Sequence, residues 1–480
     1  MLRANVKSFS EGELKITRMT EKETLPGLSD AVDAGLPAAI ADLSNLVRIP
    51  SVAWDGFDFA HVDASAEAVR ELFEQTGVFD LVEVRRAPEA GTDKLGQPAV
   101  LGRRTARNGK PTILLYAHHD VQPPGNAEDW DSLPFEPTVR GDRLYARGAA
   151  DDKAGVVSHL AAIRALVETV GPALDLGIVV FIEGEEEFGS RSFKNFLELY
   201  KDDLQSDVIV VADSDNWDTK IPALTVALRG NVTLKLRVST LSHASHSGMF
   251  GGAVPDAMLA TIRLLATLHD ENGSVAVPGL VTHAAETPEY DEHKLREEAG
   301  LLDGVSPIGS GPILDRLWYQ PAITVTGIDA PSVQNASNTL SPSTTVKVSM
   351  RLAPGQSPQL AFEALEKHLR DHAPFGAQLE ISDVDLGSPF LVDTSGWAVA
   401  EATDAMAEAW GAPAVQIGVG GSIPFIADLV ELFPAAQVLV TGVEDPDSRA
   451  HSPNESLHLG VFRRAILAEA ILLAKLNSRT

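Results

Sequence analysis

Three short, continuous apolar runs in the first half of the chain constrain its fold most strongly. They are PTILLYAH (111–118), LGIVVFIEG (176–184) and SDVIVVAD (206–213). Because these runs are rich in Ile and Val and do not alternate with polar residues, they are typical of strands that are buried on both faces. The segment 154–171, between the first two runs, has apolar residues at helical spacing and ends in Gly. Strand, helix and strand in this order predict right-handed crossovers and a mainly parallel sheet with helices on both faces.

A second group of predicted elements, after residue 228, has a different pattern. The run 232–240 alternates as a half-exposed strand does, and the segment 255–270 is amphipathic with a helical period. Two strands, a helix and a last strand are then predicted at 322–328, 344–352, 358–372 and 377–385. The order β-α-β-β-α-β is the ferredoxin-like arrangement, here interrupted by a polar insertion at roughly residues 280–318.

These patterns predict two domains, which the length of 480 residues also favours. We expect a mainly parallel α/β domain formed by residues 1–228 and 391–480, because strand and helix patterns of the first kind resume near the C-terminus. A ferredoxin-like α+β domain at residues 229–390 would interrupt this domain.

The composition excludes several kinds of site and partner. The chain has no Cys, so a metal ion would have to be held by nitrogen and oxygen ligands. The formal net charge of −28 disfavours nucleic acid or an anionic membrane as a partner. No uninterrupted apolar run approaches the length of about 18 residues that a membrane span needs, and the N-terminus lacks the apolar block of a secretory signal. We therefore expect a cytoplasmic protein, in which residues 1–18 could be an extension before an alternative start at Met19.

Histidines and carboxylates follow the ends of the predicted strands. They are His118, His119 and Asp120, then Glu185, Glu186 and Glu187, then Asp213 and Asp215, and finally His451, while Asp151 and Asp152 open the predicted helix. The carboxyl ends of strands in an open α/β sheet meet at one edge, so these groups should converge. A salt-bridged network and separate solvated loops are the alternatives, but crowded carboxylates favour a bound cation. Nitrogen and oxygen ligands suit Zn²⁺, with Mn²⁺ or Co²⁺ as alternatives. Two such ions, bridged by a carboxylate, would activate water and polarise a carbonyl group.

The same residues lie in motifs that resemble a known family, the co-catalytic zinc metallopeptidases. This family includes carnosine-type dipeptidases, carboxypeptidase G, succinyl-diaminopimelate desuccinylase and acetylornithine deacetylase. The motifs follow the family's order between residues 117 and 455 and are AHHDVQP, ARGAADDKAG, EGEEEFGS, VVADSDNW, SHSGMFGG, RLAPGQ, GGSIP and AHSPNE. Their forms are most similar to the dipeptidase branch. The resemblance implies a hydrolase that cleaves dipeptides or short peptides with a free C-terminal carboxylate, or alternatively an N-acyl-amino-acid deacylase with the same metal chemistry.

The resemblance also implies roles for individual residues. The ligands of two divalent ions would be His118, Asp151, Glu187, Asp213 and His451, with Asp151 shared by both ions. Asp120 would orient the imidazole of His118, and Glu186 would act as the general base. The peptide bond between Asp151 and Asp152 would be cis.

Two assignments have a rival nearby in the sequence. Asp215 is an alternative to Asp213 as a ligand, but Asp213 directly ends its apolar run and its spacing to Pro222 resembles that in the dipeptidases. His119 follows His118, and because successive side chains of an extended chain point to opposite faces, we expect His119 to lie outside the site.

The interposed domain supplies three further candidates through the resemblance. His246 would reach the active site of a partner subunit and stabilise the oxyanion, which implies a homodimer formed through this lid domain. Arg351 would receive the C-terminal carboxylate of the substrate, a task that suits a bidentate guanidinium group. Ser422, on a Gly-rich turn, would contact the same carboxylate.

Overall fold

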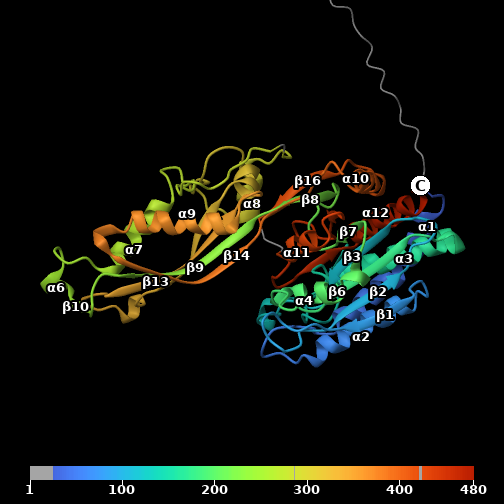
Figure 1. Cartoon of the computed structure of the whole chain (residues 1–480), viewed down its shortest axis with the longest axis horizontal. Helices are drawn as coiled ribbons and strands as arrows, with labels where there is room; N and C mark the ends of the chain where they lie inside the picture. Colours follow the sequence, from blue (N-terminus) through green and yellow to red (C-terminus); the bar gives the residue numbers. More distant parts are fainter. Residues whose placement is uncertain (1–24, 286, 421–423, 480) are drawn as a thin grey trace, which may run out of the picture.

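A computed structural model describes residues 25–285, 287–420 and 424–479 of the chain. Figure 1 shows two lobes: a wide lobe built on a large sheet and an elongated lobe built on a smaller one. The N-terminal half and the C-terminal segment from about residue 390 form the wide lobe, and the middle of the chain forms the elongated lobe.

The wide lobe contains a nine-stranded sheet. Its order is β1 (Leu81–Arg85), β2 (Ala99–Arg104), β6 (Gly177–Glu183), β3 (Thr112–His118), β7 (Val208–Val211), β17 (Gln437–Val440), β8 (Ala223–Leu228) and β15 (Phe390–Leu391), and β16 (Val415–Val419) also pairs with β8. The central strands β6, β3, β7 and β17 are parallel, whereas β1 and β2 pair antiparallel at one edge. The strands predicted at 111–118, 176–184 and 206–213 are therefore confirmed as β3, β6 and β7.

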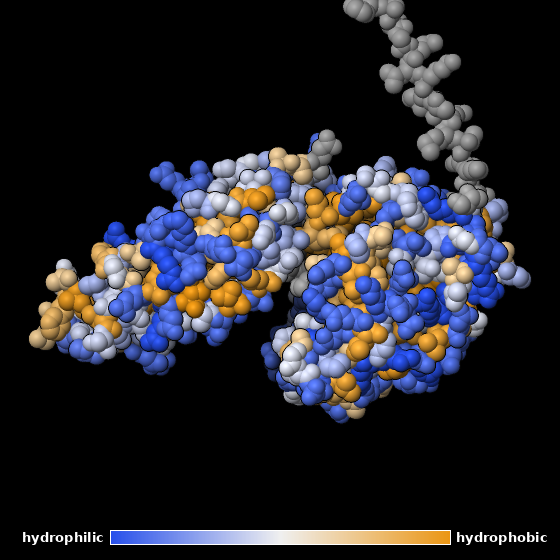
Figure 2. Space-filling view, in the orientation of Figure 1, coloured by the Kyte–Doolittle hydropathy of each residue, from blue (hydrophilic) through white to orange (hydrophobic). Residues whose placement is uncertain are grey.

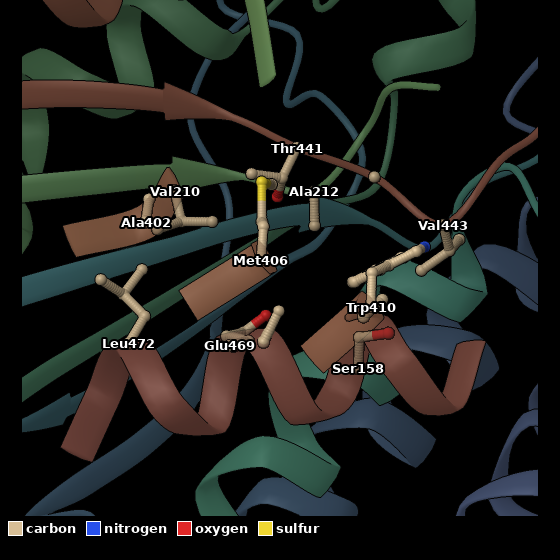
Figure 3. A pocket seen from close by; sticks show the side chains of 13 residues that line it. Ser158, Val210, Ala212, Ala402, Met406, Trp410, Thr441, Val443, Glu469 and Leu472 are labelled. Atoms are coloured by element: carbon tan, nitrogen blue, oxygen red, sulfur yellow. The ribbon is translucent and has the colours of Figure 1, made fainter. Parts of the chain in front are cut away.

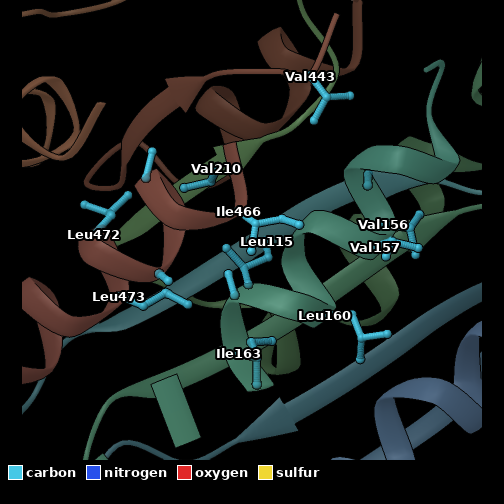
Figure 4. Packing of buried hydrophobic residues seen from close by; sticks show 14 of the residues in the cluster. Leu115, Val156, Val157, Leu160, Ile163, Val210, Val443, Ile466, Leu472 and Leu473 are labelled. Carbon is cyan, nitrogen blue, oxygen red and sulfur yellow. The ribbon is translucent and has the colours of Figure 1, made fainter. Parts of the chain in front are cut away.

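Helices cover both faces of this sheet, as predicted. One face packs against α1 (Leu28–Val47), α2 (Ala60–Glu74), α3 (Lys153–Val170), α10 (Trp397–Trp410) and α12 (Leu459–Ser478), and the other against α4 (Phe193–Leu199) and α11 (Pro424–Leu432). Successive residues of β3 enter opposite cores, since Leu115 packs on the α3 side and Leu114 on the α4 side. Figure 4 shows Leu115 between Leu160 of α3 and Ile466 of α12. A strand buried in this way must be apolar throughout, which explains its continuous apolar run.

Helix α3 is the central helix of the larger core. Among the described residues, Lys153–Ala173 is the one helical stretch whose length and apolar composition would allow it to cross a membrane. Its most apolar window is 61% buried, and its residues pack against α1, α12 and β3. Packing within the core therefore accounts for its apolar composition.

The elongated lobe has a four-stranded antiparallel sheet. Its order is β11 (Ala322–Asp329), β13 (Ser343–Leu352), β9 (Gly230–Ser239) and β14 (Gln378–Gly387), and α7 (Ala257–Leu265) and α9 (Pro358–Asp371) pack on it. This connectivity confirms the ferredoxin-like arrangement. The boundaries at 229 and 390 remain a prediction.

The far end of the elongated lobe carries a short antiparallel pair of β10 (Ser245–His246) and β12 (Thr339–Leu340), and α6 (Ser247–Phe250) follows β10. Figure 2 shows apolar surface at this end. Met249 and Phe250 contribute to it with exposed side chains.

Smaller elements complete the structure. A three-stranded sheet is formed by β4 (Thr138–Arg140), β5 (Arg143–Tyr145) and β18 (Ser456–His458), and α5 (Lys201–Leu204) precedes β7. The segment 269–321, which contains the predicted polar insertion, forms α8 (Glu292–Ala299) and a helical turn at Asp315–Tyr319. We call it the inserted segment below.

Candidate metal centre

The predicted ligands lie at the carboxyl edge of the large sheet. His118 is the last residue of β3, Asp213 follows β7, and Glu187 lies in a helical turn directly after β6. Asp151 immediately precedes the first turn of α3, and His451 lies in the loop between β17 and β18. The parallel strands thus bring together residues that are more than 330 positions apart in the sequence (118 to 451).

Two groups of donor atoms form at this edge. The first contains His118, Glu186 and Asp213, and the second contains Asp151, Glu187 and His451. In each group the donor atoms all lie within 4.8 Å of one another. The structure therefore brings together all five predicted ligands and the predicted general base.

Asp151 connects the two groups. Its Oδ1 lies 3.1 Å from Nε2 of His118, and its Oδ2 lies 2.9 Å from Nε2 of His451. Each carboxylate oxygen therefore faces a different histidine, which is the placement that a bridging ligand needs. The peptide bond between Asp151 and Asp152 is cis, as the resemblance implied.

Asp120 holds neighbouring residues of the site in place through hydrogen bonds of its backbone and its side chain. Nδ1–H of His118 donates to the backbone carbonyl of Asp120 at 3.1 Å, and the Asp120 carboxylate lies slightly farther away, at 3.4 Å. This contact leaves Nε2 of His118 directed at Asp151. The Asp120 carboxylate also accepts the backbone N–H groups of Glu186 and Glu187, each at 3.1 Å. Asp120 therefore positions the histidine and the turn after β6 together.

Burial and crowding change the protonation of the carboxylates. Burial, together with the charge of Asp151, raises the pKa of Glu187 to about 7. Burial also raises the pKa of Asp213 to about 6 and that of Glu186 above its usual range, although His118 opposes both shifts. Contacts with Asp151 and Glu187 raise the pKa of His451 to about 11. Burial therefore disfavours the charged form of Glu186, Glu187 and Asp213.

The donor set fits two divalent cations. It consists of imidazole nitrogens and carboxylate oxygens, and burial raises the pKa values of Glu187 and Asp213. Divalent cations would favour the charged form of these carboxylates, and bound histidines would be neutral ligands. The chain has no Cys, so soft thiolate sites are excluded.

Asp213 lies in the donor cluster, and Asp215 does not. Oδ1 of Asp213 is 3.9 Å from Nε2 of His118, whereas Asp215 pairs through its backbone with Glu444 in the neighbouring loop. His119 points away from the cluster, as expected. Its Nε2–H donates to the backbone carbonyl of Pro98 at 2.9 Å, and burial lowers its pKa to about 4.

The candidates from the interposed domain lie apart from this cluster. His246 is exposed in β10, at the far end of the elongated lobe (Figure 1). Arg351 is half-buried near the end of β13, where the two lobes meet. Ser422 lies outside the described residues.

The structure also identifies supporting residues to which the sequence assigned no role. Glu455 accepts the backbone N–H groups of Ala150 and Asp151 at 2.9 and 3.1 Å and pairs with Arg147 at 2.6 Å. Gln122 donates to the Glu187 carboxylate from its backbone and from its side chain. Glu455 and Gln122 belong to the motifs AHSPNE and AHHDVQP, so their neighbourhood in the sequence was the available signal.

A separate cavity of about 40 Å³ lies on the face of the sheet that α10 and α12 cover. Figure 3 shows Met406, Trp410 and Glu469 around it. Glu469 there contacts Nδ1 of buried His159 at 2.8 Å, and Nε2–H of His159 donates to the backbone carbonyl of Tyr116 at 3.0 Å. None of the predicted metal ligands is among the described residues that line this cavity.

Comparison with known proteins identifies a family. The pattern of the peptidase family M20/M25/M40 matches residues 114–475. A cysteinylglycine-S-conjugate dipeptidase of Corynebacterium striatum is 36% identical over 396 residues, which are 80% of this chain and 87% of that protein. The Cys-Gly metallodipeptidase dug1 of Schizosaccharomyces pombe is 28% identical over 93% of this chain and 97% of its own. The crystal structure of human carnosine dipeptidase 1 has the same fold, with a TM-score of 0.75 and 22% identity over 94% of this chain and 98% of that chain.

Proposed function

The chain belongs to the peptidase family M20/M25/M40, and from this premise we propose that it is a two-metal dipeptidase. Its substrates would be dipeptides or short peptides with a free C-terminal carboxylate. One observation carries the proposal: the Asp151 carboxylate lies between two groups of metal-ligand donors, with one oxygen near each histidine. The dipeptidase names of the relatives in Corynebacterium striatum and Schizosaccharomyces pombe support the substrate class.

We assign the five ligands to two ions. His118 and Asp213 would hold one ion, Glu187 and His451 the other, and Asp151 both. Bound Zn²⁺, or else Mn²⁺ or Co²⁺, would polarise the scissile carbonyl and activate the attacking water.

Glu186 would act as the general base. Its Oε2 lies 4.0 Å from Nε2 of His118, on the turn that Asp120 holds, so the carboxylate faces the same space as the ligands. There it can accept a proton from the attacking water and return the proton to the leaving amine.

The elongated lobe would bind the substrate and form a homodimer. The guanidinium group of Arg351 would bind the C-terminal carboxylate, with Ser422 as a second contact. His246 is exposed beside Met249 and Phe250, which offer apolar surface to a second copy of the chain. In such a dimer, His246 would stabilise the oxyanion in the partner's site.

The net charge of −28 argues against a nucleic-acid or anionic-membrane partner, and we propose a cytoplasmic location. The competing hypothesis is an N-acyl-amino-acid deacylase with the same metal chemistry. The two hypotheses differ in whether the substrate carries a free N-terminal amine.

A substrate panel tests the proposal. The zinc-loaded protein should hydrolyse dipeptides such as Ala-Gly and Cys-Gly faster than N-acetyl or N-succinyl amino acids. Glu186→Gln should lower kcat by about 10²-fold or more while the metal content stays near two ions per chain, because a general base contributes about 10²- to 10⁴-fold. Turnover of the acyl compounds alone would contradict the dipeptidase assignment, and a fully active variant would exclude Glu186 as the base.

A further inference from the structure

A second cavity lies where the inserted segment packs against the wide lobe. Its volume is about 270 Å³, close to the lower end of small-molecule sites, which span about 300–1,000 Å³. Trp217 and Asp215 line it from the loop after β7, and Ile417–Gly420 line it from the end of β16. The inserted segment lines the opposite side with Tyr290, Lys294, Glu298, Leu314, Leu317 and Trp318. In Figure 1, α8 of this segment lies between the two lobes, beside β16.

The walls of this cavity, which we call the aromatic pocket, are held by specific contacts. The rings of Trp217 and Trp318 meet edge to face at a centroid distance of 6.5 Å, and those of Trp217 and Tyr290 do so at 6.2 Å. Nζ of Lys294, on α8, lies 4.0 Å from the ring centroid of Trp217. These contacts fasten the inserted segment to the wide lobe through one tryptophan.

Gly418 shapes the same wall from β16. A Cβ atom added at this position would lie 2.6 Å from Cγ of Trp318. The indole therefore packs directly on the strand backbone because residue 418 has no side chain. A larger residue would push Trp318 away from the strand.

One end of the pocket carries an acidic side chain that is close in sequence to the metal centre. Asp215 lines the pocket and is two residues after the predicted ligand Asp213. Its backbone pairs with Glu444 in the loop that continues to His451. The Asp215 carboxylate would attract an ammonium group and repel a carboxylate.

We propose that the aromatic pocket binds the side chain of the N-terminal residue of the dipeptide, with Asp215 facing the substrate's ammonium group. The pocket would select substrates whose N-terminal residue has a large apolar or aromatic side chain. This inference rests on the proposed dipeptidase function and deepens it. The position of Asp215 favours the N-terminal residue over the C-terminal residue, because the latter carries the substrate's carboxylate.

The test compares two dipeptides that differ only in the N-terminal side chain. For the zinc-loaded enzyme, kcat/KM should be at least about 10-fold higher for Phe-Gly than for Ala-Gly, because a well-packed apolar pocket distinguishes such groups by factors of this order. Trp217→Ala should reduce the ratio to within about 3-fold, mainly through a higher KM for Phe-Gly. Gly418→Ala should have a similar effect by displacing Trp318.

A matched control comes from the same inserted segment. Leu302 is 75% exposed and does not line the pocket, so Leu302→Ala should leave the Phe-Gly to Ala-Gly ratio unchanged. The milder variant Trp217→Phe should keep most of the preference, and thermal unfolding of each variant checks its folding.

The outcomes separate this inference from the proposed function. An enzyme that hydrolyses neither dipeptide contradicts the proposed function. An enzyme that hydrolyses both, but loses equal activity on both in Trp217→Ala, contradicts the pocket assignment. The reversed dipeptides Gly-Phe and Gly-Ala serve as a further check. If Trp217→Ala changed kcat/KM only for these two substrates, the pocket would bind the C-terminal residue, and the assignment would be wrong.

Discussion

Replacing Asp120 with Asn tests how the metal centre is supported. In the native protein, the Asp120 carboxylate accepts two backbone N–H groups, those of Glu186 and Glu187, at 3.1 Å each. An Asn side chain has the same shape but only one accepting oxygen. Its NH₂ group would therefore face one of the two N–H donors, and the turn that carries Glu187 would shift.

The magnitude follows from these contacts. A hydrogen bond to a charged group contributes about 1.5–3 kcal/mol, and a neutral one about 0.5–1.5 kcal/mol. Losing one charged bond and weakening the other should therefore cost the turn about 2–4 kcal/mol. Residues that orient metal ligands typically change metal affinity by about 10- to 100-fold. We expect Asp120→Asn to raise the Kd for zinc by this factor.

Competition with a fluorescent zinc chelator measures the two dissociation constants, and kcat is measured at saturating zinc. Asp270→Asn is the matched control, because the Asp270 carboxylate also accepts two backbone N–H groups, at 2.9 Å each, but lies in the elongated lobe. The control should bind zinc as the native protein does. Native affinity and native kcat in Asp120→Asn would refute the supporting role.

Two further predictions concern the dimer and the core. Mixing His246→Ala with Glu186→Gln should give heterodimers that regain activity, because one active site then has both residues; mixtures that stay inactive would refute the shared site. The charge of Glu469 holds the pKa of His159 above its usual range despite burial. The stabilisation from this pair is therefore present below the unfolded pKa of about 6.5 and is lost as the pH rises through the folded pKa. Glu469→Gln should lower Tm more at pH 6 than at pH 9. The difference between the two losses should correspond to about 1–2 kcal/mol of unfolding free energy. Equal losses of Tm at both pH values would show that His159 and Glu469 do not form a charged pair.

The central strands of the large sheet, and the residues at its carboxyl edge, could be predicted from the sequence because both depend on local patterns. Continuous apolar runs identify buried strands, and residues that directly follow such strands must lie at the carboxyl edge. His118 and Asp213 could therefore be placed from the sequence. The edge strands β1 and β2 were not identified, because β1 is only half-buried and contains two charged residues, and β2 ends in two half-buried arginines.

The contacts that support the site could not be predicted, because they join distant parts of the chain. Asp120 accepts N–H groups from residues 66 and 67 positions away, and Glu455 does so from residues 304 and 305 positions away. No local pattern encodes these distances. The aromatic pocket is a similar case, since Trp217 and Trp318 meet only when the inserted segment folds onto the wide lobe.

The shared carboxylate of Asp151 has a thermodynamic consequence for the two-ion centre proposed above. An ion held by His451 and Glu187 would draw on the same carboxylate as an ion held by His118, so the two binding equilibria are linked. Linkage is reciprocal, which means that occupancy of either site changes the affinity of the other by the same factor. With one ion bound, the Asp151 carboxylate would be held in place for the other ion, and the negative charge of the site would be smaller. The binding of two zinc ions would therefore show positive or negative cooperativity. Two independent dissociation constants could not describe it.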